Sequence, residues 1–241
     1  MNCAAMSLAG KRVVVIGGAS GIGFAVATLA QELGAQVVIA STNAEKVAAA
    51  AERLPGVTGR KVDLRDEASV SDLFEKLGAF DHLAITAGDW GGSRFVATSD
   101  LDLVAARDGF EIRFWGVLAA VKHASRTIAP NGSITFTSGM MAHRPRKGAP
   151  LATAIGGAVE YLARGLAIDL APLRVNAVSP GMILTEMVKM APEETLRAWV
   201  AGLPLPRGAT PTEAGTAYIY SMLNGYLTGQ VLAVDGGGLL V

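Results

Sequence analysis

Short apolar runs alternate with longer segments of helical periodicity along this 241-residue chain. The apolar runs are KRVVVIG, AQVVIA, GRKVDL, DHLAIT, GSITFTS, LRVNAVS and GQVLAV, and the helical segments lie at 21–33, 44–54, 67–77, about 100–128, 152–170 and about 211–223. Continuous apolar runs are typical of strands that are buried on both faces, and their alternation with helices indicates parallel pairing. We therefore predict an α/β fold: one doubly wound domain over residues 1–241, with a seven-stranded parallel sheet flanked by helices.

One stretch, residues 182–210, does not follow this alternation. It holds Met182, Met187, Met190 and Trp199 among prolines and glycines. We expect it to form a lid-like segment or a partner surface outside the sheet.

Composition excludes several classes of protein. The 21 lysines and arginines balance the 21 aspartates and glutamates, which gives no support for binding to nucleic acid or to an anionic membrane. Cys3 is the only cysteine, so a disulfide within the chain and a cysteine zinc site are excluded. No run reaches about 18 uninterrupted apolar residues, and the N-terminus lacks the pattern of a signal peptide. We expect a cytoplasmic protein that acts on a small molecule, without a metal.

A glycine-rich loop follows the first predicted strand, in the sequence VVVIGGASGIGFAVA. Gly17, Gly21 and Gly23 stand at the start of the first helix, and Ser20 and Ile22 lie between them. Glycine allows a tight turn there and lets the backbone approach a pyrophosphate at the helix N-terminus. Because a strand precedes the loop and a helix follows it, we expect the loop to bind a dinucleotide rather than only to turn the chain.

The spacing Gly-x-x-x-Gly-Ile-Gly resembles that of the short-chain dehydrogenase/reductase family, whose fold is Rossmann-like, and the likeness runs from about residue 9 to the C-terminus. KVDLRD resembles the family's segment at the adenine, TAG resembles its Asn-Ala-Gly turn with Thr86 in place of asparagine, and VNAVSPGMILTEM resembles its segment around the nicotinamide. YLTGQVLAVDGG matches the family's last strand. These resemblances imply that the cofactor contacts Asp63, Leu64, Ala87, Gly88, Pro180, Gly181, Ile183 and Thr185.

The residues after the second predicted strand bear on the choice of nicotinamide cofactor. An acidic residue about 20 residues beyond the glycine loop favours NAD, because its carboxylate holds the ribose hydroxyls. Here the strand ends in Ser41, Thr42 and Asn43, which carry no charge to repel a 2′-phosphate. We predict NADP as the cofactor, with NAD as the alternative. These residues are also suited to capping the next helix.

Two of the catalytic residues that the resemblance implies are missing from this sequence. The family uses an asparagine, a serine, a tyrosine and a lysine, and Ser138 fits the serine position. Ungapped alignment on AVEYLARGLAIDLAPLRVNAVSPG puts Ala152 at the tyrosine position and Gly156 at the lysine position. Tyr161 follows Ala152 by nine residues and therefore points to the opposite face of the predicted helix.

Arg113 stands at the asparagine position in DGFEIRFWGVLAAVKHA. We expect its guanidinium to extend into the volume vacated at Gly156, towards Ser138 and the ribose, where it binds an oxyanion or a carboxylate. The alternative is a structural ion pair with Asp108, Glu111 or another helix.

The loop after Ser138 holds one further candidate, His143, whose imidazole has an ordinary pKa suited to acid–base work. A solvated loop histidine is the alternative. Arg144 and Lys147 are candidates for binding an acidic substrate, and Asp89 and Trp90 are candidates for the mouth of the cleft.

The sequence thus predicts an NADP-dependent oxidoreductase with a non-standard active site, which reduces a small carbonyl, imine or activated double bond. One alternative is a cofactor-binding sensor or partner subunit without turnover, and the other is a non-redox enzyme that reuses the pocket. The resemblance also implies a homodimer or homotetramer, formed by the helices at about 100–128 and 152–170.

Overall fold

In the computed structural model, which describes residues 6–88 and 96–241, seven strands form one parallel sheet in the order β3-β2-β1-β4-β5-β6-β7. The strands are β1 (Arg12–Ile16), β2 (Gln36–Ser41), β3 (Thr58–Lys61), β4 (Phe80–Ile85), β5 (Ile128–Thr137), β6 (Arg174–Pro180) and β7 (Val231–Val234). Strand β1 pairs with β2 on one side and with β4 on the other, so the strand order reverses there. The predicted fold class is confirmed, and such a reversal is where doubly wound sheets bind ligands.

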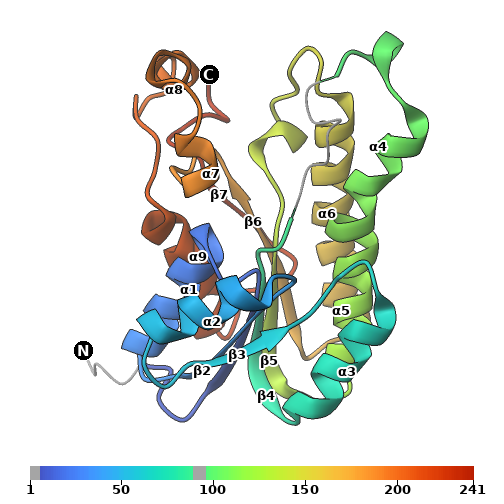
Figure 1. The fold of residues 1–241 in the computed structure, drawn as a ribbon, viewed down its shortest axis with the longest axis vertical. Coiled ribbons are helices and arrows are strands. Elements are labelled where there is room, and N and C mark those ends of the chain that lie inside the picture. The colour runs from blue at the N-terminus through green and yellow to red at the C-terminus, as the bar shows by residue number, and fades with distance from the viewer. Residues whose placement is uncertain (1–5, 89–95) are drawn as a thin grey trace.

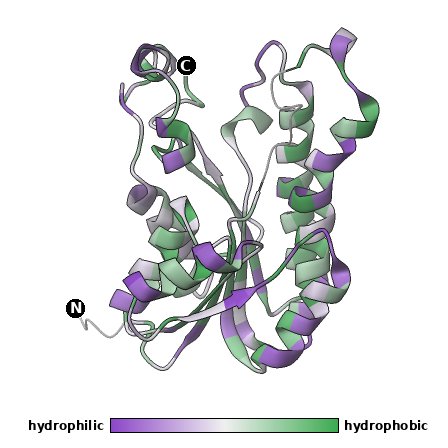
Figure 2. Ribbon diagram, viewed as in Figure 1, coloured by the Kyte–Doolittle hydropathy of each residue, from purple (hydrophilic) through white to green (hydrophobic). Residues whose placement is uncertain are grey.

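Helices cover both faces of the sheet (Figure 1). They are α1 (Gly21–Glu32), α2 (Ala44–Arg53), α3 (Glu67–Leu77), α4 (Leu103–Phe110), α5 (Val117–Ala124), α6 (Pro150–Asp169), α7 (Glu186–Lys189), α8 (Glu193–Val200) and α9 (Pro211–Leu223). Helices α3, α5 and α6 share one apolar core with the sheet, and α1, α2 and α9 share the other. Figure 2 shows the hydrophobic residues gathered along the strands and the helices that cover them. The sheet is therefore buried on both faces, as its apolar strands predict.

The helix that we predicted at about 100–128 is divided. A π-helical turn, η3 (Glu111–Gly116), separates α4 from α5, and β5 already begins at Ile128. Such a turn adds a residue to the helical repeat and therefore changes the direction of the side chains that it carries, and π turns of this kind are frequent at functional sites. Arg113 lies within this turn.

Helix α6 is long and apolar enough, by length and composition, to cross a membrane. It is also a core helix, because Val159, Ala163 and Ala167 pack into the sheet's apolar core. The buried carboxyl of Glu160 lies on the same helix. Burial of this face against the sheet accounts for the apolar composition.

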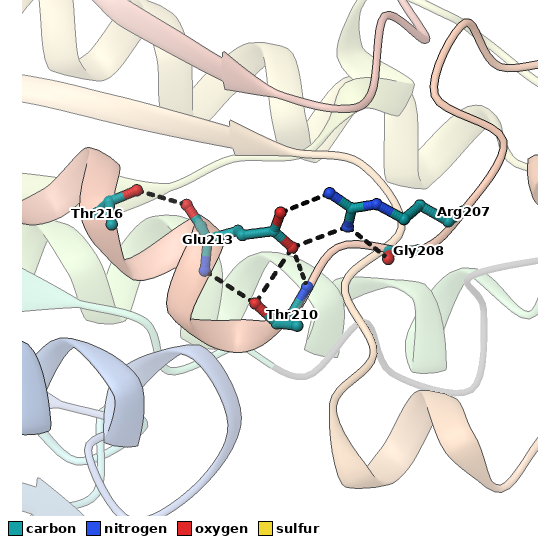
Figure 3. Close-up of polar contacts among 5 residues, drawn as sticks. All are labelled: Arg207, Gly208, Thr210, Glu213 and Thr216. Carbon is teal, nitrogen blue, oxygen red and sulfur yellow. Dashed lines mark hydrogen bonds and ion pairs between the residues drawn. The ribbon is translucent and has the colours of Figure 1, made fainter.

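Residues 182–210 carry the short helices α7 and α8 at the carboxyl end of the sheet. The segment returns to the domain beside α9, where both guanidinium N–H groups of Arg207 donate to Glu213, at 2.9 and 2.6 Å (Figure 3). The same carboxylate accepts from the backbone N–H of Thr210, which caps α9. Arg207 and Thr210 lower the pKa of the Glu213 carboxyl to about 2. This network fixes one end of the segment to the first turn of a packed helix.

Candidate active site

The glycine loop between β1 and α1 leaves the N-terminus of α1 open to a ligand. The side chain of its N-cap residue, Ser20, makes no capping hydrogen bond, and the first turn holds no acidic residue. The helix therefore presents N–H groups and the positive end of its dipole without a built-in anionic partner. An anion such as a pyrophosphate fits this terminus.

Two glycines are required by close approach of the backbone. Gly17 has a φ of +90°, and a Cβ at this position would lie 2.4 Å from the backbone nitrogen of Ala87. A Cβ at Gly23 would lie 2.2 Å from the carbonyl oxygen of Gly17. Any side chain at either position would push the loop away from β4 and α1.

A cavity of about 1070 Å³ opens at the carboxyl ends of the strands, beside this loop. It brings together most of the residues that the sequence predicted for the site. Its lining includes Gly17, Ser20, Gly21, Ile22, Gly23, Ser41, Thr42, Asp63, Leu64, Ala87, Gly88, Arg113, Ser138, Pro180, Gly181, Ile183 and Thr185. Asn43 and His143 are not among the described lining residues. Asp89 and Trp90 lie outside the described residues.

At the end of the cavity next to β2, cations that sequence reasoning missed join Ser41 and Thr42. Lys46 and Arg53 of α2 both line the cavity. They stand seven residues apart, on the helix face that also carries Ala49 and Ala50. Residues at this spacing share one face of a helix, and this is the sequence signal that could have identified the two cations. The Arg53 guanidinium lies over the ring of Phe24, 4.2 Å from its centroid. This end of the cavity is therefore positively charged.

Asn43 is the N-cap of α2. Its side-chain oxygen accepts a hydrogen bond from the backbone N–H of Lys46 at 2.8 Å. The capping role that we considered for this residue is confirmed, and a direct role towards the cofactor stays a prediction.

Arg113 extends from the π turn to the segment after β4. Its Nη2 donates to the carbonyl oxygen of Gly88 at 3.1 Å, and its side chain is almost fully buried. The guanidinium and Ser138 both line the cavity. This hydrogen bond joins Arg113 to Gly88 and not to Ser138, and a Cβ at Gly156 would meet Ala142.

Ser138 follows the last residue of β5 and is 2% exposed. Its Oγ lies 2.7 Å from Oε1 of Glu160 and 3.2 Å from the carbonyl oxygen of Gly156. A hydroxyl has one hydrogen, so Ser138 donates to one of these acceptors at a time. Its partners on α6 fix its hydroxyl at the cavity wall.

Glu160 is a further functional candidate that sequence reasoning missed. Its carboxyl is buried, and its second oxygen, Oε2, lies 2.7 Å from Nε2 of His143. His143 follows the short helix η4 (Met140–Ala142), and its side chain is 40% exposed. The available signal was spacing: Glu160 follows Gly156 by one helical turn and lies on the face of α6 that we predicted to meet the cavity.

None of the four tyrosines is among the described residues that line the cavity. Tyr161 is 72% exposed, which confirms that it points to the outer face of α6, and Tyr220 and Tyr226 are also exposed. Tyr218 is fully buried, and its hydroxyl lies 2.6 Å from Oγ1 of Thr137. Burial raises the pKa of this phenol well above its usual value, so Tyr218 stays protonated as a structural partner of β5.

The other end of the cavity, beyond Ser138, is mostly apolar, although Arg146 and Glu186 also line the cavity. Its lining there comes from η4 and from the segment 182–210, and includes Met140, Met141, Met182, Met187, Met190, Trp199 and Leu203. Methionine side chains adapt to irregular apolar ligands. Within the described residues, no group of three or more histidine, cysteine, aspartate or glutamate side chains is placed to hold a metal ion.

Comparisons with known proteins agree with this geometry. A family model described as enoyl-(acyl carrier protein) reductase matches residues 17–238. The short-chain dehydrogenase/reductase ATR9 of Stachybotrys chlorohalonatus is 34% identical over 97% of this chain and 99% of that protein. Among solved structures, the MalC reductase/Diels-Alderase from Malbranchea aurantiaca is 34% identical, with a TM-score of 0.90 over 98% of this chain and 99% of that one. A small-chain dehydrogenase in complex with NADPH is 35% identical, with a TM-score of 0.83 over 96% of this chain and 99% of that one.

Proposed function

This chain belongs to the short-chain dehydrogenase/reductase family, and we propose that it is an NADP-dependent oxidoreductase that reduces a small carbonyl, imine or activated carbon–carbon double bond. The observation that carries the proposal is one cavity that joins the open N-terminus of α1, a cationic end at α2 and a mostly apolar end beyond Ser138. These three parts match the pyrophosphate, the phosphorylated ribose and the reacting end of the cofactor with its substrate.

The residues present fit NADP. The glycine loop would hold the pyrophosphate, and Asp63 and Leu64 would border the adenine. Lys46 and Arg53, beside Ser41 and Thr42, would hold the 2′-phosphate, since cations favour this group. Bound at this site, NADPH would supply a hydride for the reduction. The NADPH complex of the related dehydrogenase supports the same choice.

We further propose that the active site lacks the family's usual tyrosine and lysine. The alignment that puts Ala152 and Gly156 at those positions is supported by their location on the inner face of α6, where both are buried. It is also supported by the exposure of Tyr161. Carbonyl reduction leaves an oxyanion that must be neutralised or stabilised. Ser138 would orient the substrate oxygen, and Arg113 would stabilise its charge.

The segment 182–210 would act as the lid over the substrate. Met187 and Trp199 line the cavity from this segment, and Met187 is 61% exposed. A lid with apolar side chains excludes water from the reacting groups when it closes. These side chains favour a substrate with an apolar body.

We propose that the protein forms a homodimer or homotetramer, in the cytoplasm, through the outer faces of α4, α5 and α6. Leu103 and Val104 of α4 and Ile168 of α6 are large, apolar and exposed. Light scattering at micromolar concentration tests this, because a stable monomer would contradict it.

The experiment that tests the function is cofactor oxidation with a panel of chemically distinct acceptors. We expect NADPH to bind more tightly than NADH in a fluorescence titration, and to be oxidised in the presence of phenylglyoxal, cyclohexenone or a dihydroisoquinolinium salt. Tight binding of NADPH without turnover on any acceptor would contradict the enzyme and favour a cofactor-binding sensor.

A further inference from the structure

We propose that His143, Glu160 and Ser138 form a proton relay from solvent to the active-site cavity. The inference rests on the proposed function and identifies the source of the proton that the reduction consumes. The two oxygens of one buried carboxyl have one partner each: His143 Nε2 at 2.7 Å and Ser138 Oγ at 2.7 Å. The histidine is 40% exposed at one end, and the serine lines the cavity at the other.

The burial of Glu160 makes this arrangement suited to carrying a proton. Its side chain is 2% exposed, and a buried carboxylate is costly unless it is paired or protonated. Both of its partners are groups that can give and take a proton. Each oxygen of the buried carboxyl is therefore paired with a group that can exchange a proton with it.

The relay balances as a sequence of proton transfers. The Oγ–H bond of Ser138 breaks, and the proton bonds to the substrate atom that has gained the electron pair of the former double bond. The carboxyl proton on Oε1 of Glu160 moves to Ser138 Oγ. A doubly protonated His143 (imidazolium) passes its Nε2 proton to Oε2 of Glu160 and becomes a neutral imidazole that keeps its Nδ1 proton. Solvent then reprotonates His143, and rotation of the carboxyl group resets the relay. No electron moves along it.

The alternative is a structural role, in which Glu160 only fastens the loop of His143 to α6. The variant Glu160→Gln separates the two roles, because glutamine keeps the shape and can hydrogen-bond both neighbours but cannot transfer a proton. A matched control is the second histidine–glutamate pair, in which His123 Nε2 lies 3.0 Å from Oε1 of Glu67, away from the cavity.

The first measurement needs no turnover. In nitrogen-15 NMR spectra of the histidine side chains, Glu160→Gln should shift the resonances of His143 and leave those of His82 and His123 in place. Glu67→Gln should shift His123 alone. An unchanged His143 signal in Glu160→Gln would show that the first link of the relay is absent in solution.

The second measurement compares two substrates. Reduction of phenylglyoxal needs a proton, whereas reduction of an N-methyl dihydroisoquinolinium salt needs none, because the nitrogen simply loses its charge. Glu160→Gln should lower turnover of phenylglyoxal at least about tenfold, since general acid catalysis typically contributes about 10²–10⁴-fold. Turnover of the iminium salt, NADPH affinity and thermal stability should be nearly unchanged.

The third measurement is rescue. In His143→Ala, added imidazole should restore turnover of phenylglyoxal, because it can protonate Glu160 from the vacated position. Equal turnover in wild type and Glu160→Gln, or loss in His143→Ala without rescue, would overturn the relay. If the wild-type protein reduces no acceptor, the proposed function fails and the relay fails with it. If the wild-type protein reduces the iminium salt but not phenylglyoxal, the relay is contradicted and the oxidoreductase function stands.

Discussion

The carbonyl oxygen of Gly88 accepts a hydrogen bond from Nη2 of Arg113, and the space that a side chain at position 88 would occupy is filled by the guanidinium. A Cβ on Gly88 would lie 2.5 Å from Cζ of Arg113. Any side chain at position 88 would therefore displace the guanidinium of Arg113. This contact holds a buried cation in the wall of the cavity that Ser138 also lines.

Removing the charge of Arg113 should impair catalysis. Arg113→Met keeps the length of the side chain but removes the group that would stabilise an oxyanion. We expect turnover or substrate affinity to fall at least about tenfold, which corresponds to roughly 1.4 kcal/mol of transition-state stabilisation. Steady-state kinetics with phenylglyoxal measures this, and circular dichroism checks that folding is intact.

Gly88→Ala provides a second route to the same position. The added methyl group should displace the guanidinium and lower turnover in the same direction, while the charge is retained. Unchanged kinetics in both variants would place Arg113 outside the reaction.

Cofactor preference should depend on the charges at α2. Arg53→Met removes a cation from the end of the cavity that we assign to the 2′-phosphate, so the affinity for NADPH should fall at least about tenfold while that for NADH stays nearly constant. Thr42→Asp should shift preference towards NADH, because a carboxylate there repels the phosphate.

Fluorescence titration of both cofactors measures these shifts. Arg60→Met is the matched control, since Arg60 is exposed on β3 and is not among the lining residues. If Arg53→Met weakens NADPH and NADH equally, the cation contributes to general binding and not to the choice between the cofactors.

Most of the fold could be predicted from the sequence because its signals are local. Buried parallel strands read as continuous apolar runs, and all seven predicted strands are present. The third was predicted to reach Leu64 but ends at Lys61, because edge strand β3 has only β2 to pair with. The π turn at Arg113 breaks the periodicity of one predicted helix, and a repeat pattern cannot show it.

The site was harder to predict because its contacts join residues far apart in the sequence. The glycine loop and Ser138 could be found, since their neighbours in sequence identify them. The contact between Ser138 and Glu160 depends on how α6 packs against β5, and the pairing of Glu160 with His143 depends on the path of a loop. Lys46 and Arg53 could not be predicted in the same way, because which face of α2 meets the cavity depends on how this helix packs against the sheet.

Installing the family's tyrosine and lysine should raise carbonyl reduction. In Ala152→Tyr/Gly156→Lys, turnover of phenylglyoxal should rise at least about tenfold, because a tyrosine beside a lysine would donate the proton directly and not through three residues. A Cβ at Gly156 would lie 3.1 Å from Cβ of Ala142, so the loop must shift by a few tenths of an ångström. Overpacking of this kind typically costs about 1–3 kcal/mol.

Thermal unfolding and NADPH titration check that the double variant is folded and binds the cofactor, so that its turnover can be compared with that of the wild type. The single variant Gly156→Ala measures the cost of filling the space alone. A folded double variant with wild-type affinity for NADPH and no gain in turnover would contradict the assignment of these two positions.

The stability of the protein should fall in mildly acidic solution because of His82. This side chain is 5% exposed, and its Nδ1 lies 2.9 Å from Oγ of Ser133. Burial, together with the nearby positive charge of Arg174, lowers the pKa of His82 from 6.5 to about 4. The neutral form is therefore the one that the fold favours. Above pH 6.5 both the folded and the unfolded state hold it neutral, and its contribution to stability is complete. As the pH falls from 6.5 towards 4, the unfolded state binds a proton that the folded state does not bind, and the free energy of unfolding declines by at most about 3 kcal/mol.

Denaturant titrations at several pH values measure this decline. His82→Gln keeps a polar partner for Ser133 and should flatten the curve between pH 6.5 and 4. A wild-type curve that is already flat over this range would show that His82 is not the source of acid sensitivity.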